Sequence, residues 1–474
     1  MDLSQTLASI NAVLWNETWI LIIAATGVMF TLWSGFSQYR ALTHGTRVVR
    51  GDYDDPDDPG AISHFQALSA ALSGTVGLGN IGGVALAISL GGPGAIFWMW
   101  VVGFLGMSIK LTEVTLSMLY RNTDDPDNPH GGPMWVAGKA LKRINPRFAW
   151  LGATLGAVYG FCVMASSITG GNMFQAWNVA DITGSYFGVP GWIAGVVLTL
   201  AVGAVLIGGI KRIGRVTGAL VPGMVFVYVI AGFYVLFSNA GEIPGMLSLI
   251  VTSAFTSTEA AGAFVGGTVA SAFLFGMKRA VFSNEAGQGS SAIAHSAAKT
   301  DEPVREGLVG GLEPFIDTIV VCTFTALIIL STGIWNRAPD VMLETPLEAQ
   351  QRADGWAFPD VPLPAGNWNQ DAALLMVVDA GPNPATGQNR HRISGAVSLD
   401  GGQPVAVWQT FSGEVQPIVA GGGFYVDHVG ATLTAKAFDT ALPGLGKWLI
   451  TIASWLFAIS TIITWGYYGE QGAI

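Results

Sequence analysis

The chain has 474 residues, of which 51% are hydrophobic and only 11% are charged, whereas an ordinary soluble domain is about 25% charged. With a mean hydropathy of +0.48, this composition excludes a disordered, collagenous, disulfide-stapled or nucleic-acid-binding protein and indicates a polytopic α-helical membrane protein. The net charge of −10 comes mostly from loop aspartates and argues against a polyanionic partner. Both cysteines, Cys162 and Cys322, lie in apolar runs, so we expect them to be small core residues.

Nine stretches are apolar enough, and long enough at about 20 residues, to cross a bilayer as helices. They cover residues 12–36, 64–90, 93–120, 148–177, 190–209, 215–238, 262–296, 307–333 and 446–468. Fifteen of the 22 Lys and Arg residues then fall on one side of the membrane, and the short loops on the other side hold none. This asymmetry predicts a multi-pass protein of the cell (inner) membrane with its N-terminus outside.

Residues 334–445 form a polar insert of more than 100 residues that is expected outside the membrane. Within it, the apolar-rich segments 393–399 and 403–409 flank Asp400-Gly401-Gly402, a pattern that predicts a β-hairpin with a glycine-rich turn. We therefore expect a small β-containing extracytoplasmic insert, which is either passive or helps to capture a substrate.

The most informative stretch runs from Ser73 to Gly83 in the middle of the second apolar segment, and five of its residues are glycines. Each glycine weakens a helix by about 1 kcal/mol relative to alanine. Inside a bilayer, the unpaired peptide groups of a broken helix are tolerated only where they are buried or line a wet cavity. Two half-helices that meet there present N–H groups suited to a carboxylate and C=O groups suited to Na⁺.

A second stretch, Glu285 to Ser290, has a similar small-Gly-x-Gly pattern and lies five spans later. Two glycine-broken helices at matching places in two halves indicate an inverted-repeat transporter with a site at the membrane midplane. Close helix packing through small residues is the alternative interpretation of either stretch.

Five stretches of the sequence resemble the alanine/glycine:cation symporter family, the sodium:alanine symporters. They are residues 73–80, 90–100, 130–134, 278–295 and 465–470. The resemblance covers most of 1–333 and 425–470, and it implies an all-α polytopic membrane protein with a leucine-transporter-like inverted repeat. The implied domains are an extra N-terminal helix (1–36), a first five-helix repeat (62–238), a second repeat left incomplete after spans seven to nine (262–333 and 446–474), and the insert (334–445).

The resemblance also implies a function: Na⁺-coupled secondary active symport that imports a small neutral amino acid, alanine or glycine. The sequence lacks Walker, H-E-x-x-H, paired-cysteine and nucleophile-elbow motifs, so we expect no enzyme activity and transport driven by an ion gradient. The alternatives are an H⁺-coupled symporter that uses Asp317 or Glu285, and a truncated homologue that does not transport. The oligomeric state is left open.

The resemblance and the glycine break together define a predicted site. The substrate carboxylate is expected at the backbone N–H groups of Leu78 and Gly79, its ammonium at the Thr75 carbonyl, and a polar side chain at Gln175. The full set of predicted substrate-binding residues is Thr75, Gly77, Leu78, Gly79, Asn80, Gln175, Phe273, Gly276 and Asn284.

Sodium prefers five or six hard oxygen ligands. The fold resemblance places one Na⁺ between the carbonyls of Ser73 and Val76 and the hydroxyls of Ser460 and Thr461, with Asn80 and the substrate carboxylate able to complete a second site. Hydrogen bonds from the two hydroxyls back to carbonyls of their own helix are the alternative.

Ionisable residues inside apolar segments are costly and therefore informative. Lys110 and Glu113 are expected to be a snorkelling pair. Asp317 is expected either to pair with Lys278 or Arg279 as an inner gate or to carry a proton. The two histidines near span ends, His64 and His295, are expected to be interfacial.

Overall fold

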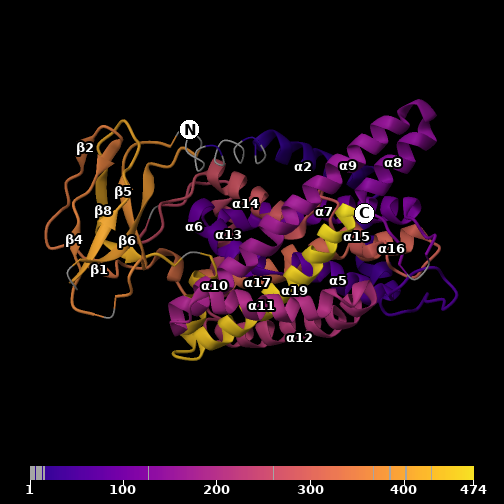
Figure 1. Cartoon of the computed structure of the whole chain (residues 1–474). Helices are drawn as coiled ribbons and strands as arrows, with labels where there is room; N and C mark the ends of the chain where they lie inside the picture. Colours follow the sequence, from indigo (N-terminus) through magenta and orange to yellow (C-terminus); the bar gives the residue numbers. More distant parts are fainter. Residues whose placement is uncertain are drawn as a thin grey trace.

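The computed structural model describes residues 6, 13, 16–125, 128–259, 261–366, 368–383, 386–400, 403–428 and 430–474. These residues form a body of helices with a β-sheet at one end (Figure 1). In the described part of the chain, five helical segments are long and apolar enough to cross a membrane, or seven if two bent pairs each count as one span. The five are Gly94–Tyr120, Pro146–Phe187, Gly209–Ser238, Pro303–Ser331 and Gly446–Ala473.

Two bent pairs include the first two predicted spans: the first span, 12–36, covers only the first helix of its pair, and residues 37–49, expected as a loop, form the second half. In the first, α2 (Glu17–Trp33) turns by 73° into a run made of α3 (Ser37–Arg40), η1 (Ala41–Gly45) and α4 (Thr46–Val49). In the second, a 50° bend separates α5 (His64–Thr75) from the run of η2 (Gly79–Gly83) and α6 (Val84–Gly91). The predicted interruption of the second span is therefore confirmed. The straight helix α7 (Gly94–Tyr120) follows.

The next part of the chain is helical throughout, and two of its helices are absent from the predicted spans. It consists of α8 (Pro133–Ile144), η3 (Pro146–Phe148), α9 (Ala149–Ser166), η4 (Ser167–Met173), α10 (Phe174–Phe187), α11 (Gly191–Leu206), α12 (Gly209–Ser238) and α13 (Ile243–Ser253). The unpredicted helices are α8 and α13, because both lie between apolar stretches and are too short to register as spans. Cys162 on α9 is exposed, so its prediction as a core residue is wrong, whereas Cys322 is buried as predicted.

The seventh predicted span is also interrupted. Its helix α14 (Val269–Asn284) has only 16 residues, and the chain leaves it at Glu285, which adopts a left-handed φ of 55°. Gly287 and Gly289 have positive φ as well, which glycine tolerates without strain. The short helix α15 (Ser291–His295) follows, and then α16 (Pro303–Gly310), η5 (Phe315–Cys322), α17 (Thr323–Ser331) and η6 (Ile334–Asn336).

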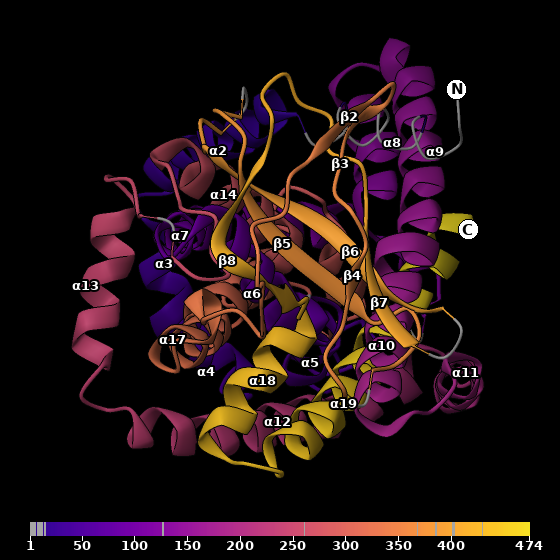
Figure 2. The same ribbon diagram turned by 90° about the vertical axis from the view of Figure 1, so that its left-hand side faces the viewer.

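The insert contains a six-stranded antiparallel sheet in the order β1-β8-β5-β6-β7-β4, and a separate β2–β3 pair. The strands are β1 (Val341–Met342), β2 (Gln350–Arg352), β3 (Gly355–Ala357), β4 (Val361–Pro362), β5 (Ala373–Asp379), β6 (Arg390–Asp400), β7 (Gln403–Trp408) and β8 (Ile418–Val426). Because β6 and β7 pair with Asp400 opposite Gln403, the predicted pairing of the hairpin strands is confirmed, and the turn residues Gly401 and Gly402 lie outside the described residues. Figure 2 shows the sheet lying across one end of the helical body.

Two features tie the insert to the helices. The helix α18 (Ala431–Ala441) packs against η2, α17 and the last helix, α19 (Gly446–Ala473), and its Thr434 hydroxyl donates to the Ile81 carbonyl at 2.9 Å. On the sheet side, the Gln388 amide donates to the carbonyls of Leu90 (3.1 Å) and Gly266 (2.5 Å). Gln388 therefore bridges the end of α6 and the segment that leads into α14.

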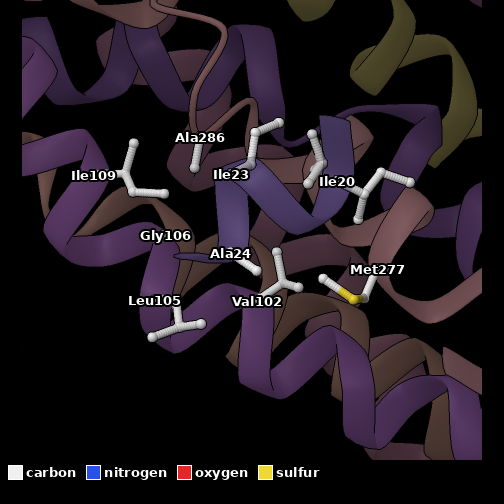
Figure 3. Close-up of a pocket in the computed structure, with 10 residues that line it drawn as sticks. Ile20, Ile23, Ala24, Val102, Leu105, Gly106, Ile109, Met277 and Ala286 are labelled. Atoms are coloured by element: carbon white, nitrogen blue, oxygen red, sulfur yellow. The ribbon is translucent and has the colours of Figure 1, made fainter. Parts of the chain in front are cut away.

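The helix α2 packs on α7 and α14 mainly through apolar side chains. Two hydrogen bonds also join it to α7: the hydroxyls of Thr31 and Ser108 lie 3.1 Å apart, and the Ser108 hydroxyl donates to the Gly27 carbonyl at 3.1 Å. Ile20, Ile23 and Ala24 face Val102 and Met277 among the residues around a cavity of about 10 Å³ (Figure 3). A cavity of this size and lining is at the lower limit for a single water. This contact is therefore a packing surface and offers no chemistry.

Candidate functional site

The break between α5 and η2 exposes backbone groups that a continuous helix would pair. Val76 leaves the helical conformation with ψ of 86°, although its N–H still bonds to the Leu72 carbonyl at 2.7 Å. The next two N–H groups then bond to side chains, Gly77 to Asn80 Oδ1 at 2.8 Å and Leu78 to Gln175 Oε1 at 3.2 Å. Side-chain oxygens thus occupy positions where a carboxylate could bind, and Gln175 comes from α10, 97 residues later.

A cavity of about 530 Å³ lies against this break, within the range of about 300–1,000 Å³ that is usual for small-molecule sites. Four predicted residues line it: Thr75, Gly77, Gly79 and Gln175. The lining residues that the substrate prediction missed are Trp19, Ile20, Ile23, Gly74, Ser166, Thr169, Gly170, Val281, Phe282, Glu285, Gln288 and Trp465. Among the described lining residues Glu285 alone is ionisable, and its carboxylate accepts a hydrogen bond from Ser290.

Glycines at the break allow the close approach of α19 and α10. A Cβ at position 77 would collide with the Thr461 hydroxyl and lie 3.5 Å from Gln175 Oε1. At position 171, which lies in η4, a Cβ would collide with the ring of Trp465. The packing of α19 against the break and η4 therefore depends on small residues at these two positions, which gives Gly77 a steric role beside its predicted backbone role.

Asn80 faces away from the cavity, toward η5. Its side-chain N–H groups reach Asp317 Oδ1 at 2.6 Å, and Asp317 Oδ2 accepts from the hydroxyls of Ser283 (2.8 Å) and Thr318 (2.7 Å). All four residues are buried. The expected partners of Asp317, Lys278 and Arg279, are thus replaced by uncharged donors on three elements, and Asn80 links Asp317 to the break.

The residues predicted for Na⁺ come together beside the break. The Ser73 hydroxyl lies 2.7 Å from both the carbonyl and the hydroxyl oxygen of Ser460. The Thr461 hydroxyl is buried and has no hydrogen-bond partner among the described residues, so it does not bond back within its own helix. Ser73, Val76, Ser460 and Thr461 are each at most 1% exposed. A buried hydroxyl without a partner beside the break is available as a cation ligand.

Three further predicted residues lie outside the cavity. Phe273 packs edge-on against Trp98 with ring centroids 4.9 Å apart, and a Cβ at Gly276 would collide with the Ala95 carbonyl, so both residues pack α14 on α7. Asn284 organises the second break instead. Its Oδ1 accepts from the Ala286 N–H at 3.0 Å, and its amide donates to Thr318 at 3.1 Å.

Two expectations about charged residues are wrong. Lys110 does not snorkel, because it is fully buried and its ammonium lies 3.6 Å from Glu313 Oε2. His64 and His295 are not interfacial, because they are 1% and 0% exposed and both bond to Glu306. Glu113, the expected partner of Lys110, accepts a hydrogen bond from the Gly287 N–H at the second break, 2.8 Å away.

Comparison with known proteins matches most of the chain to one family of transporters. A family model described as the sodium:alanine symporter family matches residues 1–354 and 417–473. The chain is 35% identical over 471 residues to a Methanococcus maripaludis protein named sodium/alanine symporter AgcS, covering 99% of this chain and 83% of that one.

Two Bacillus subtilis relatives are also similar. One, named putative sodium/proton-dependent alanine carrier protein YrbD, is 31% identical over 468 residues, which cover 99% of this chain and 78% of the relative. The other, named probable sodium/glutamine symporter GlnT, is 35% identical over 328 residues, which cover 69% of this chain and 65% of the relative. The chain therefore belongs to the sodium:alanine symporter family, whose members are membrane transporters rather than enzymes.

Proposed function

We propose that the chain is a Na⁺-coupled symporter that imports a small neutral amino acid, alanine or glycine. The observation that carries this proposal is the broken helix α5–η2, which borders a cavity of about 530 Å³ and lies beside the buried hydroxyls of Ser73, Ser460 and Thr461. A relative that covers nearly the whole chain is named a sodium/alanine symporter, which supports the same substrate and ion.

The substrate would bind as a zwitterion across the break. Its carboxylate would take over the N–H groups of Gly77 and Leu78, for which the Asn80 and Gln175 side chains now act as acceptors. Its ammonium would lie toward the Thr75 carbonyl and the Glu285 carboxylate, both in the cavity wall. Since a charged group buried without a partner is costly, binding of each substrate charge depends on the facing protein group.

Sodium would bind on the other side of the break, with Ser73, Val76, Ser460 and Thr461 as ligands. This position is next to Gly77, so ion and substrate would share one short stretch of backbone. An ion that orders the α5–η2 junction would prepare the N–H groups for the carboxylate, and the substrate would do the same for the ion. Such reciprocal stabilisation is what coupled transport requires.

The membrane arrangement completes the proposal: a multi-pass protein of the inner membrane with its N-terminus outside, an extracytoplasmic insert, and two inverted repeats. The excess of Lys and Arg on one side supports the orientation. The two interrupted helices, α5–α6 and α14–α15, support the repeat.

Proton coupling is the second candidate. The observation that favours it is the buried Asp317 carboxylate, which lies 2.6 Å from the Asn80 amide and so contacts the break directly. One relative is named a putative sodium/proton-dependent alanine carrier. A proton on Asp317 would change the hydrogen bonds of Asn80 and therefore the conformation of the break.

Uptake of radiolabelled alanine and glycine into proteoliposomes tests both candidates. With an inward Na⁺ gradient at equal pH on both sides, we expect accumulation that a Na⁺ ionophore abolishes and that an equal K⁺ gradient does not support. Accumulation driven by a pH gradient alone, without Na⁺, would favour proton coupling. If folded protein accumulates neither amino acid under either gradient, the proposed function is wrong.

A further inference from the structure

A buried chain of ionisable side chains lies at the end of the helical body away from the sheet, where α15 and α16 are found (Figure 1). Its members are His64 at the start of α5, His295 at the end of α15, Glu306 on α16, Glu313 just after α16, and Lys110 on α7. Each is at most 1% exposed. We refer to these five residues as the His–Glu–Lys network.

The members are in direct contact. Glu306 bonds to both histidines, with Oε2 at His64 Nδ1 and Oε1 at His295 Nδ1. The other ring nitrogen of His295, Nε2, lies 2.7 Å from Glu313 Oε1. Lys110 lies 3.6 Å from Glu313 Oε2, which completes the chain. The network thus joins the first half-helix, α5, to three other elements.

The contacts specify how many protons the network holds. An ionised carboxylate only accepts hydrogen bonds, and both nitrogens of His295 face carboxylates, so both carry hydrogen and His295 is an imidazolium. Two carboxylates are then balanced by His295 and Lys110, and His64 is neutral. Two carboxylates, the Lys110 ammonium and two neutral imidazoles have a net charge of −1. The network is therefore neutral only if it holds one further proton, whichever side chain carries it. A fully buried network with an unbalanced charge would be strongly destabilised.

The same region holds α5 closed against α15 and α16 through the backbone. The residues before α5 pair with those after α15, since the Ala61 N–H donates to the Ala297 carbonyl and the Lys299 N–H to the Ile62 carbonyl, both at 2.8 Å. The Arg121 guanidinium donates to four carbonyls of these two segments: Pro59, Ser296, Ala298 and Thr300. Because α5 is only 12 residues long and ends at the break, it can move as a unit if these contacts open.

We propose that the His–Glu–Lys network is a proton-binding site. It keeps this end of the helical body closed and gives up its proton when α5 separates from α15 and α16. This inference rests on the proposed function, since it assigns a regulation to the same broken helix. It is distinct from coupling through Asp317, which belongs to the other side of the break.

The proton has a route to water. His64 Nε2 has no hydrogen-bond partner among the described residues and lies 4.0 Å from Asp54 Oδ1, whose side chain is 49% exposed. On opening, one N–H bond of His295 breaks with its electron pair left on nitrogen, and the proton passes to water that enters between α5 and α15 at this exposed edge. The other charged or titratable groups that face the network are Asp54, Glu113, Arg121, Glu285, Asp317 and Tyr468.

The sign of the pH effect follows. A histidine in water has a pKa of about 6.5, so a hydrated imidazole is mostly neutral at pH 8. The closed form then holds one proton more than the open form, and raising the pH favours opening by up to about tenfold per pH unit.

Hydrogen–deuterium exchange of the purified, substrate-free full chain tests the proposal without any transport measurement. After correction for the intrinsic pH dependence of exchange, amides of 64–75 should exchange up to tenfold faster per unit between pH 7 and 8.5. His295→Gln should abolish this acceleration. His44→Gln, which alters a histidine on η1 that packs on α16 but lies outside the network, should leave it unchanged.

His295→Gln alone leaves an unbalanced carboxylate and could fail to fold. The double variant His295→Gln with Glu313→Gln removes one charge of each sign, so it is expected to fold and to show no pH-dependent exchange of α5. The proposal is overturned if wild-type exchange of α5 shows no such acceleration, or if the double variant retains it. A wild-type chain with this acceleration but without Na⁺-driven alanine uptake would instead count against the proposed function alone.

Discussion

The buried hydroxyl of Thr461 makes a sharp test of the Na⁺ site, because ion binding and folding predict opposite effects of its removal. Thr461→Val keeps the shape of the side chain and deletes the hydroxyl. Since this hydroxyl is 1% exposed and lacks a partner among the described residues, its burial costs about 1–3 kcal/mol, and the variant should be more stable than wild type without Na⁺.

With Na⁺ the advantage of the variant should shrink by about 1.3 kcal/mol. An ion at a hundred times its dissociation constant stabilises the folded state by about 2.7 kcal/mol. Loss of one of the few oxygen ligands should weaken Na⁺ binding by about tenfold or more, or ~1.4 kcal/mol per tenfold. At the same Na⁺ concentration the variant would gain only about 1.4 kcal/mol, so it should lose about half or more of the rise in melting temperature that NaCl gives the wild type.

The assay is thermal unfolding of purified protein in detergent, with NaCl titrated against choline chloride at constant ionic strength. Thr464→Val is the matched control, one turn further along α19, because its hydroxyl already donates to the Ala70 carbonyl at 3.0 Å. The control should lose about 1 kcal/mol of stability and keep its Na⁺ response. An undiminished Na⁺ response in Thr461→Val, or a lower melting temperature in choline chloride, would refute the reasoning.

Three other outcomes are expected. Gly77→Ala should abolish alanine uptake, because the new Cβ collides with the Thr461 hydroxyl. Gly170→Ala, which has open space at its Cβ, should retain uptake. Equal uptake by the two variants would contradict the steric role of Gly77. Gln175→Leu should lower the KM for alanine, as measured in proteoliposomes, because it removes the side-chain oxygen that competes with the substrate carboxylate for the Leu78 N–H; an unchanged KM would place the substrate elsewhere. Burial lowers the pKa of His428 to about 4. The contribution of the neutral imidazole to stability is therefore full above about pH 6.5 and is lost as the pH falls toward 4. The melting temperature should drop more between pH 7.5 and 5 in wild type than in His428→Gln.

The helix breaks could be predicted because their causes are local. Gly77 and Gly79 lie where a continuous helix would otherwise cross the membrane, and the cost of unpaired backbone in lipid restricts such a stretch to a functional place. The β6–β7 hairpin was predicted for a similar reason, since turn chemistry and strand pattern are adjacent in the sequence. In each case one short window contains the whole physical argument.

The buried charges could not be predicted, because their partners are distant in sequence. His64 and Glu306 are 242 residues apart, and each lies near the end of an apolar stretch, where exposure to headgroups is the ordinary expectation. The contact between Lys110 and Glu313 could not be predicted for the same reason. One available signal was that all these residues, with His295, fall at apolar-segment ends on one predicted side, which is an unusual concentration of ionisable groups.

Placement of Phe273 and Gly276 in the site failed for a different reason. Their spacing on α14 suits a lining face, but the same face packs against α7, and the sequence alone does not say which neighbour a helix face meets. The break after α14 begins only at Glu285, about two turns beyond Gly276, so the cavity receives Phe282 and Glu285 instead.

The amide of Gln388 fixes a spacing as well as a contact. One planar group holds the carbonyls of Leu90 and Gly266, so the end of α6 and the approach to α14 stay a constant distance apart while both bonds last. The two interrupted helices must then move together at this end, with the sheet moving with them. Otherwise their movement must begin by breaking the hydrogen bonds of Gln388.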